Sequence, residues 1–466
     1  MIFSSFTFLW YFLPLTLFSY YLLPGLRLKN FFLLAASLLF YSWGHFPHLI
    51  WLLEIITLTY LVSFGIRGPH SQRFLWLGIL FILGGLFYFK YFNFSLSVFQ
   101  RAVNGDWFIP DIILPIGISF YSFQAISYLV DIYRGGPIQK NFFDLALYIS
   151  MFPQLVAGPI VKYHTVRRQL LKRRHTLEKV YLGFRRFAMG LGKKIIIADT
   201  LGFTVDRVFD AQTNTLSVPI MWVGIIFYTL QIYFDFSGYS DMAIGLGKMF
   251  GFEFLENFNY PYISRSVSEF WRRWHISLSS WFKEYIYIPL GGNRQGLKRT
   301  CFNLMIVFLL TGIWHGANWT FILWGIWYGI FIVLEKCLKN HLPTGLTDGK
   351  NLCLVLLSHG YTLLIVLFGW ILFRSPSLAH TFSYVKGLFG GIAFRQQFGI
   401  GYYVRSGGWV IMTIGLLLAF GAGRKMICAR SPSWRFLSDL LLWGLLLCCI
   451  VFLTATGYNP FIYFNF

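Results

Sequence analysis

The sequence is poor in charged residues: Asp, Glu, Lys and Arg make up only 12% of its 466 residues, and only 18 of these are acidic. Hydrophobic residues make up 56% of the chain, and the mean hydropathy is +0.60. A soluble fold could not bury so much apolar surface, and several runs approach the ~20 apolar residues that a spanning helix needs. The composition therefore argues against a soluble protein and predicts a polytopic membrane protein.

Other signatures are also missing from the sequence. No strand-like alternation occurs, which favours a helical bundle over a membrane barrel. The six cysteines form no Cys-x-x-Cys or His-paired spacing, so we predict neither a metal site nor a disulfide framework. Walker, Gly-x-Ser-x-Gly and dinucleotide motifs are absent, which argues against nucleotide hydrolysis and serine hydrolases. The basic clusters adjoin apolar segments, so we expect no nucleic-acid binding.

The apolar runs predict an all-α, polytopic membrane bundle with about 11–12 membrane segments plus re-entrant and interfacial helices. We expect one domain over residues 1–466, with N-terminal helices in 1–135, a catalytic core in 136–335, and C-terminal helices with an aromatic tail in 336–466. The expected spans lie near 6–23, 31–44, 49–66, 74–90, 111–130, 183–204, 217–234, 302–334, 352–373, 407–422 and 437–455.

The run from Cys301 to Leu334 contains no charged residue and is too long for one span. As a single helix it would reach about 51 Å, against a hydrocarbon core of ~30 Å. We therefore expect a break near Gly312, Gly316 and His315, so that the run crosses twice or dips in and returns.

The net charge of +21 is unevenly distributed and predicts the topology. Between Val161 and Lys194 there are eleven Lys or Arg residues and one acid, Glu178. The positive-inside rule places this stretch in the cytoplasm, and counting spans outward places both termini outside it. The first residues lack a basic region and a small-residue cleavage site, so we expect the first apolar run to be a retained span.

The charge-free run contains the sequence TGIWHGANWTF, with a histidine at its centre. An ionisable side chain at membrane depth is costly and is by default a candidate for function. His315 could be a general base, or it could simply bond to a neighbouring helix. Asn318, one helical turn later on the same face, would donate to an oxyanion. Trp314 and Trp319 would line the site or only pack.

A second candidate region is SRSVSEFWRRWHISLSSWFKEY, which predicts an amphipathic helix at the cytoplasmic interface. Ser266 and Glu269 have the spacing of a capping box. The apolar stripe of this helix consists of Phe270, Trp271, Trp274, Leu278, Trp281, Phe282 and Tyr285.

The polar side chains of that predicted helix have two interpretations. His275 would share a face with Arg272 and Ser279, as a second catalytic or positioning group or as an ordinary interfacial histidine. Arg272, Arg273 and Lys283 could bind an anionic ligand or serve as a surface anchor.

Two further stretches bring polar or helix-breaking residues into apolar sequence. YFDFSGYSDMAIGLG carries Asp235 and Asp241 beside Gly238, and MFPQLVAGPI carries Pro153, Gly158 and Pro159. Broken backbone at membrane depth is tolerated where it is buried in protein or lines an aqueous cavity. We therefore expect the bundle to enclose a polar chamber.

Several long motifs, in order, carry a resemblance to a known family. They are LPIGISFYSFQAISYLVDIYRG, FPQLVAGPI, YFDFSGYSDMAIGLGKMFGF, SEFWRRWHISLSSWFKEYIYIPLGGNR, TGIWHGANW and the terminal PFIYFNF. In these motifs the chain resembles the membrane-bound O-acyltransferase superfamily, specifically its bacterial alginate O-acetyltransferase branch. The related peptidoglycan O-acetylating branch shares them, and the similarity covers most of the chain.

The resemblance implies a multi-pass enzyme of the bacterial inner membrane, embedded in membrane lipids, that uses acetyl-CoA and no metal. Such an enzyme passes acetyl outward, where an SGNH-type acetyltransferase partner modifies a polysaccharide. The family's near-invariant histidine falls on His315, and its second characteristic histidine on His275. With that function, Arg272, Arg273 and Lys283 would bind the phosphates of the donor.

The C-terminal residues GYNPFIYFNF are expected on the extracytoplasmic side, because the preceding loop 424–435 is basic. Tyr463 would accept the acetyl group as a phenyl ester, in line with similar aromatic tails in related acylation systems. The alternative is an aromatic belt at the membrane interface. For the whole chain, the competing functions are a transporter or channel that uses the buried His and Asp, and a scaffold that only recruits extracytoplasmic enzymes.

Overall fold

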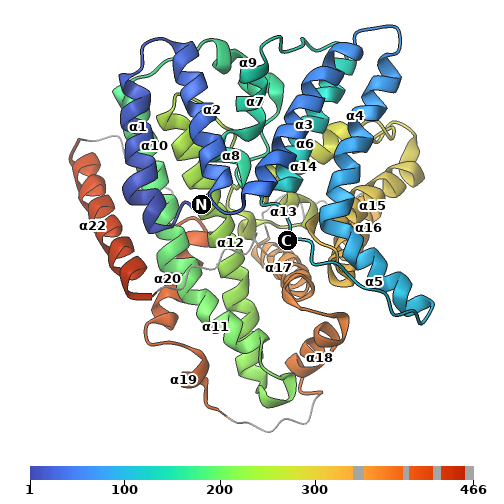
Figure 1. The fold of residues 1–466 in the computed structure, drawn as a ribbon. Coiled ribbons are helices and arrows are strands. Elements are labelled where there is room, and N and C mark those ends of the chain that lie inside the picture. The colour runs from blue at the N-terminus through green and yellow to red at the C-terminus, as the bar shows by residue number, and fades with distance from the viewer. Residues whose placement is uncertain (339–350, 392–397, 423–431, 457–466) are drawn as a thin grey trace. The chain divides into compact units, whose positions relative to one another are not determined.

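The computed structural model describes residues 1–338, 351–391, 398–422 and 432–456. Helices dominate these ranges, and no β-strand occurs within them. The all-α prediction is therefore confirmed, and the first long helices are drawn in blue in Figure 1.

Seven helices in the described ranges are long and apolar enough to cross a membrane. They are Phe46–Gly65, Ser71–Ala102, Val218–Met249, Gly296–His315, Trp319–Leu338, Leu352–Arg374 and Phe436–Ala455. Two shorter apolar helices, Phe8–Leu22 and Gly408–Ala419, accompany them. The predicted span near 111–130 falls on a shorter helix, since α6 (Ile118–Tyr133) has 16 residues. The predicted span near 183–204 lies in helical backbone that continues from α10 (Leu177–Gly192) through a π-helical stretch (Lys193–Ala198) into α11 (Asp199–Phe209), and this helix is not among the seven. The chain is a multi-pass membrane protein.

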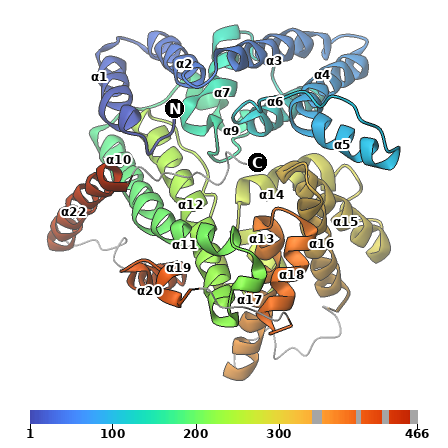
Figure 2. The ribbon, with the colours of Figure 1, turned by 60° about the horizontal axis from the view of Figure 1, so that its bottom comes forward.

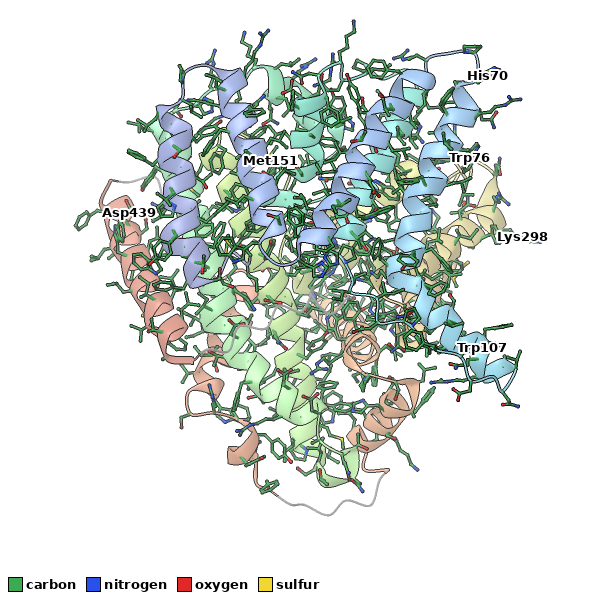
Figure 3. All side chains as sticks on the ribbon, viewed as in Figure 1. His70, Trp76, Trp107, Met151, Lys298 and Asp439 are labelled. Atoms are coloured by element: carbon green, nitrogen blue, oxygen red, sulfur yellow. The ribbon has the colours of Figure 1, made fainter. Side chains whose placement is uncertain are left out.

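The chain divides into two compact units. The first comprises Met1–Phe187 and Tyr239–Leu255. Its helices are α1 (Leu13–Leu22), α2 (Leu26–Ser42), α3 (Phe46–Gly65), α4 (Ser71–Leu86), α5 (Phe92–Ala102), α6, α7 (Phe142–Ser150), α8 (Phe152–Leu155), α9 (Tyr163–Leu171) and most of α10. Within it, α2 packs on α7, and α3 and α4 both pack on α6. His70 and Trp76 mark the first turns of α4 in Figure 3.

The second unit comprises Ala188–Gly238 and Glu256–Phe466. Its helices are α11 (Asp199–Phe209), α13 (Val267–Arg273), α14 (Ile276–Phe282), α15 (Gly296–His315), α16 (Trp319–Leu338), α17 (Leu352–Arg374), α18 (Leu378–Leu388), α19 (Ile400–Tyr403), α20 (Gly408–Ala419) and α22 (Pro432–Thr456). The helices α15 and α16 lie side by side as a hairpin, and α16 also packs on α13 and α17 (Figures 1 and 2). This unit contains both predicted catalytic histidines.

The helix α12 (Val218–Met249) supplies residues to both units and runs without interruption through Gly238. The polar residues of this motif therefore do not interrupt the helix. Ion pairs accommodate the two acids instead, because Asp235 lies 2.8 Å from Lys194 and Asp241 lies 2.6 Å from Arg186. A paired carboxylate does not require the helix to open.

The interruption predicted at MFPQLVAGPI is confirmed. Met151, labelled in Figure 3, has non-helical backbone (φ −56°, ψ 114°) and separates α7 from the single-turn helix α8. The chain then continues without regular helix as far as Lys162. Gly158 is required here, because a Cβ atom would lie 2.5 Å from the Cα atom of Gln154.

Candidate active site

The charge-free run breaks where its length predicted. The helix α15 ends at His315, Gly316 is extended, and α16 begins at Trp319. The two helices approach closely at Gly312 and Gly325, where a Cβ atom on either would lie 2.4 Å from a backbone oxygen of the other helix. The turn of the hairpin therefore fixes the position of the histidine.

His315 is 4% exposed and lies among aromatic rings from three helices. Its ring centroid is 4.8 Å from that of Trp314, 4.9 Å from that of Trp324 and 5.0 Å from that of Phe373. These rings come from α15, α16 and α17. Water is largely excluded, so electrostatic interactions of the imidazole are stronger here than at a surface.

Asn318 does not share a helical face with His315, so that part of the prediction is wrong. The reason is that α15 stops at His315, which places Asn318 at the start of the next helix. Its Oδ1 accepts a hydrogen bond from the Thr320 N–H (3.0 Å), and its Nδ2 donates to the Pro376 carbonyl (3.0 Å). The side chain thus caps α16, and its role at an oxyanion stays a prediction.

The predicted amphipathic helix is two short helices with a break at His275. Its start is as predicted, since Ser266 Oγ accepts the Glu269 N–H at 3.0 Å. However, α13 ends at Arg273, Trp274 is extended, and His275 has left-handed backbone with φ 45° and ψ 55°. His275 consequently does not share a face with Arg272 and Ser279: it is 1% exposed, whereas Arg272 is exposed.

The aromatic stripe of this region packs inside the protein and does not face a membrane interface. All seven of its predicted members are buried. Trp271 packs edge-to-face on Tyr328 of α16 at 5.0 Å, and Trp274 lies 4.9 Å from Trp370 of α17. The sequence pattern identified an apolar face correctly, but such a pattern does not say what covers that face.

His275 lies beside the same tryptophan as His315. Its ring packs edge-to-face on Phe236 at 4.6 Å and lies 6.1 Å from the ring of Trp314. Its Nδ1 is 3.1 Å from Oδ1 of Asn257, a residue that the motif analysis did not single out. Burial lowers the pKa of His275 to about 3, so the ring is neutral at physiological pH. The fold therefore places the rings of both predicted histidines next to the ring of Trp314.

An open cavity of about 630 Å³ lies in the same unit, at the start of α13. It is lined by Ile263, Arg265, Ser266, Glu269, Arg272, Arg273 and His359. Two of these, Arg265 and His359, were not singled out by the sequence analysis. His359 lies on α17, which no local pattern links to α13, whereas Arg265 directly precedes the capping residue Ser266. Lys283 is exposed and does not line the cavity.

The cavity lining carries more positive than negative charge, with three arginines and one glutamate. Arg273 Nη2 pairs with Glu269 at 2.9 Å. Burial raises the pKa of Glu269, but the Arg265 N–H and the Arg273 guanidinium outweigh burial and hold the pKa below its usual value. Arg265 and Arg272 are exposed and form no ion pair with any residue that the structure describes. The cavity thus has two guanidinium groups available for an anion.

Lys194 differs from the other members of the predicted cytoplasmic basic stretch. Its side chain is 2% exposed, and its Nζ lies 2.6 Å from Asp199 and 2.8 Å from Asp235. It belongs to a buried ion cluster in the second unit and contributes nothing to a cytoplasmic surface charge. Tyr463 and the basic residues at 424–430 lie outside the described ranges.

Comparisons with known proteins identify the family. A family model of the membrane-bound O-acyltransferases matches residues 37–352. The chain is 40% identical to the probable alginate O-acetylase AlgI of Pseudomonas putida over the full length of both proteins. It is 43% identical to that of Pseudomonas aeruginosa, over 84% of this chain and 75% of the relative. It is also 34% identical to the peptidoglycan O-acetyltransferase of Helicobacter pylori, over 84% of this chain and 80% of the relative. The chain therefore belongs to the membrane-bound O-acyltransferase family, and the protein is a membrane O-acyltransferase.

Proposed function

We propose that the protein transfers acetyl groups from cytoplasmic acetyl-CoA across a bacterial inner membrane for O-acetylation of an extracytoplasmic polysaccharide. The observation that carries this proposal is the pair of buried histidines, His275 and His315, that contact one tryptophan ring within one unit. The names of the relatives support acetyl as the transferred group. They also support an alginate-type exopolysaccharide or peptidoglycan as the acceptor.

In this mechanism His315 is the general base. The imidazole takes the proton of an acceptor hydroxyl while the oxygen attacks the thioester carbonyl carbon, and the carbon–sulfur bond then breaks. The proton passes from the imidazolium to the departing thiolate, so the products are an acetyl ester and free CoA. A general base supplies about 10²–10⁴ in rate, and the positioning of both substrates supplies much of the remainder. Asn318 is proposed to stabilise the oxyanion with an amide N–H.

The cavity at the start of α13 is the proposed site for the phosphates of the donor. Arg272 and Arg265 offer guanidinium groups that can bind phosphate in bidentate fashion. Arg273 is paired with Glu269 and contributes mainly by holding that carboxylate away from the ligand. Lys283, outside the cavity lining, adds long-range attraction for the anionic donor.

The remaining steps take place outside the cytoplasm. Both termini lie there in the proposed topology, and Tyr463 at the C-terminal end accepts the acetyl group as a phenyl ester. The serine of an SGNH-type partner enzyme then attacks this ester and passes the acetyl group to the polysaccharide. The ester retains the activation of the thioester, so the CoA itself never leaves the cytoplasm.

Reconstitution of the purified protein in liposomes with radiolabelled acetyl-CoA tests the proposal. Label should appear in the protein or in added polysaccharide fragments of the alginate or peptidoglycan type, and His315→Ala should abolish its appearance. A transporter would instead show solute or proton flux without acetyl-CoA, and a scaffold would tolerate loss of His315. Either result would refute the proposed function.

A further inference from the structure

Asn257 is fully buried in the irregular segment between α12 and α13. It forms hydrogen bonds with His275, which has left-handed backbone, and with the two residues that follow it. Its backbone carbonyl accepts the Ile276 N–H at 2.9 Å. Its side-chain Oδ1 accepts the Ser277 N–H at 3.1 Å and the Ser277 hydroxyl at 2.9 Å, and it faces His275 Nδ1 at 3.1 Å. One asparagine thus contacts three consecutive residues.

The backbone of Ser277 determines which way the amide of Asn257 points. A backbone N–H can only donate, so the side-chain atom that faces it at 3.1 Å must be the oxygen. The reversed amide would place two N–H donors against one another.

The oriented oxygen in turn determines the tautomer of His275. An amide oxygen carries no hydrogen, so the 3.1 Å contact places the hydrogen on Nδ1. The Ser277 hydroxyl also lies 3.4 Å from Nδ1, but its hydrogen goes to Oδ1 of Asn257 at the shorter distance of 2.9 Å. The ring is neutral, because burial lowers its pKa to about 3. A neutral imidazole with hydrogen on Nδ1 presents Nε2 as a bare acceptor.

We infer that Asn257 is a positioning residue that locks His275 in the Nδ1–H tautomer, so that Nε2 accepts a hydrogen bond from the acceptor hydroxyl. This inference rests on the proposed function for the identity of the substrate. His275 orients the hydroxyl, and His315 removes its proton. No covalent bond forms at His275.

Two buried polar atoms support a ligand at this position. Nε2 of His275 and Nδ2 of Asn257 are both buried, and neither has a hydrogen-bond partner among the residues that the structure describes. Unsatisfied buried polar atoms are rare and costly, and each calls for an explanation. The left-handed backbone of His275, at φ 45°, adds strain at the same residue. Unsatisfied atoms and strain together are typical of a site that is completed by substrate.

Nitrogen-15 NMR of histidine-labelled protein in nanodiscs measures the tautomer directly. The His275 signals, assigned by comparison with His275→Gln, should report a protonated Nδ1 and a bare Nε2. A protonated Nε2 would overturn the inference. This measurement needs no acetyl transfer, so it separates failure of the tautomer assignment from failure of the proposed function.

Two substitutions of Asn257 test the role in catalysis. Asn257→Ala should lower kcat about 10- to 100-fold, by analogy with the loss of hydrogen-bond partners that orient metal-bound histidines, while KM for acetyl-CoA stays unchanged. Asn257→Asp keeps an acceptor for Nδ1–H but adds negative charge, which raises the pKa of His275. Neutral His275 then exists only at higher pH, so the acid limb of the pH–rate profile should move upward.

Asn259→Ala is the matched control, since Asn259 is exposed two residues away and binds Arg273 only through its backbone. It should keep the wild-type kcat and pH profile. If Asn257→Ala turns over like this control, or if Asn257→Asp leaves the acid limb in place, then Asn257 has a purely structural role and the inference is wrong.

Discussion

Burial of His275 makes the stability of the protein sensitive to acid. The pKa of its side chain is about 3 in the folded protein, against ~6.5 in an unfolded chain. Between these two pKa values the unfolded state binds a proton at His275 and the folded state does not. The free energy of unfolding therefore falls as the pH drops below ~6.5. The loss continues until pH approaches the folded pKa, below which both states are protonated.

The size of this effect follows from the difference between the two pKa values. Each pH unit below ~6.5 costs about 1.4 kcal/mol, so acidification from pH 7 to pH 5 should remove about 2 kcal/mol. That corresponds to a change of roughly 30-fold in the unfolding equilibrium. His275→Gln, which cannot titrate, should lose about 2 kcal/mol less than the wild type over the same interval.

Denaturant unfolding in detergent micelles, followed by tryptophan fluorescence at pH 7, 6 and 5, measures the difference. Only the pH dependence is compared, because His275→Gln also changes packing at every pH. Ser280→Ala, a neighbouring substitution on α14 without a titrating group, should retain the wild-type pH dependence. If the free energy of unfolding depends on pH equally in the wild type and in His275→Gln, then the argument that His275 is buried as a neutral imidazole is refuted.

Three further predictions concern transfer itself. His315→Ala should lower the rate of acetyl transfer by about 10²–10⁴ while the protein still inserts and purifies normally, since it removes the base; turnover measured with radiolabelled acetyl-CoA near the wild-type rate would exclude this role. Reversing the charge of Arg272 and Arg273 together should weaken acetyl-CoA binding, measured by calorimetry, and reduce its salt dependence. Lys298→Glu is the control, because Lys298, labelled in Figure 3, is exposed in the first turn of α15 and does not line the cavity. Equal affinities in both variants would mean that the arginines serve only as membrane anchors. Tyr463→Phe should stop transfer to polysaccharide and leave acetyl-CoA binding intact; transfer at the normal rate would mean that the acceptor meets His315 directly.

Buried polar groups outside the site have a structural explanation that needs no catalytic role. Lys194 is enclosed with Asp199 and Asp235, and removal of the lysine would leave two buried carboxylates without a counter-ion. Such a change typically costs 3–5 kcal/mol. Loss of activity after substitution in this cluster is therefore expected from instability and does not by itself mark a catalytic residue.

The sequence alone determined the features that depend on composition, length and local pattern. The mean hydropathy required a membrane protein, and the 34 uncharged residues from Cys301 to Leu334 could not form one straight span. The break at His315 followed from that length. Long ordered motifs indicated the family, and with it His275 and His315.

Only the tertiary structure decided how the chemistry of the site is arranged. Local periodicity predicted one helix through His275, but Asn257, 18 residues earlier, bonds to Ile276 and Ser277 and helps to hold the left-handed turn that interrupts it. Helical spacing paired Asn318 with His315, whereas a close contact between glycines of two helices sets the hairpin turn that separates them. Each of these outcomes depends on a contact between segments distant in the chain. Periodicity reports which face of a helix is apolar, and it contains no information on which distant atom will meet that face.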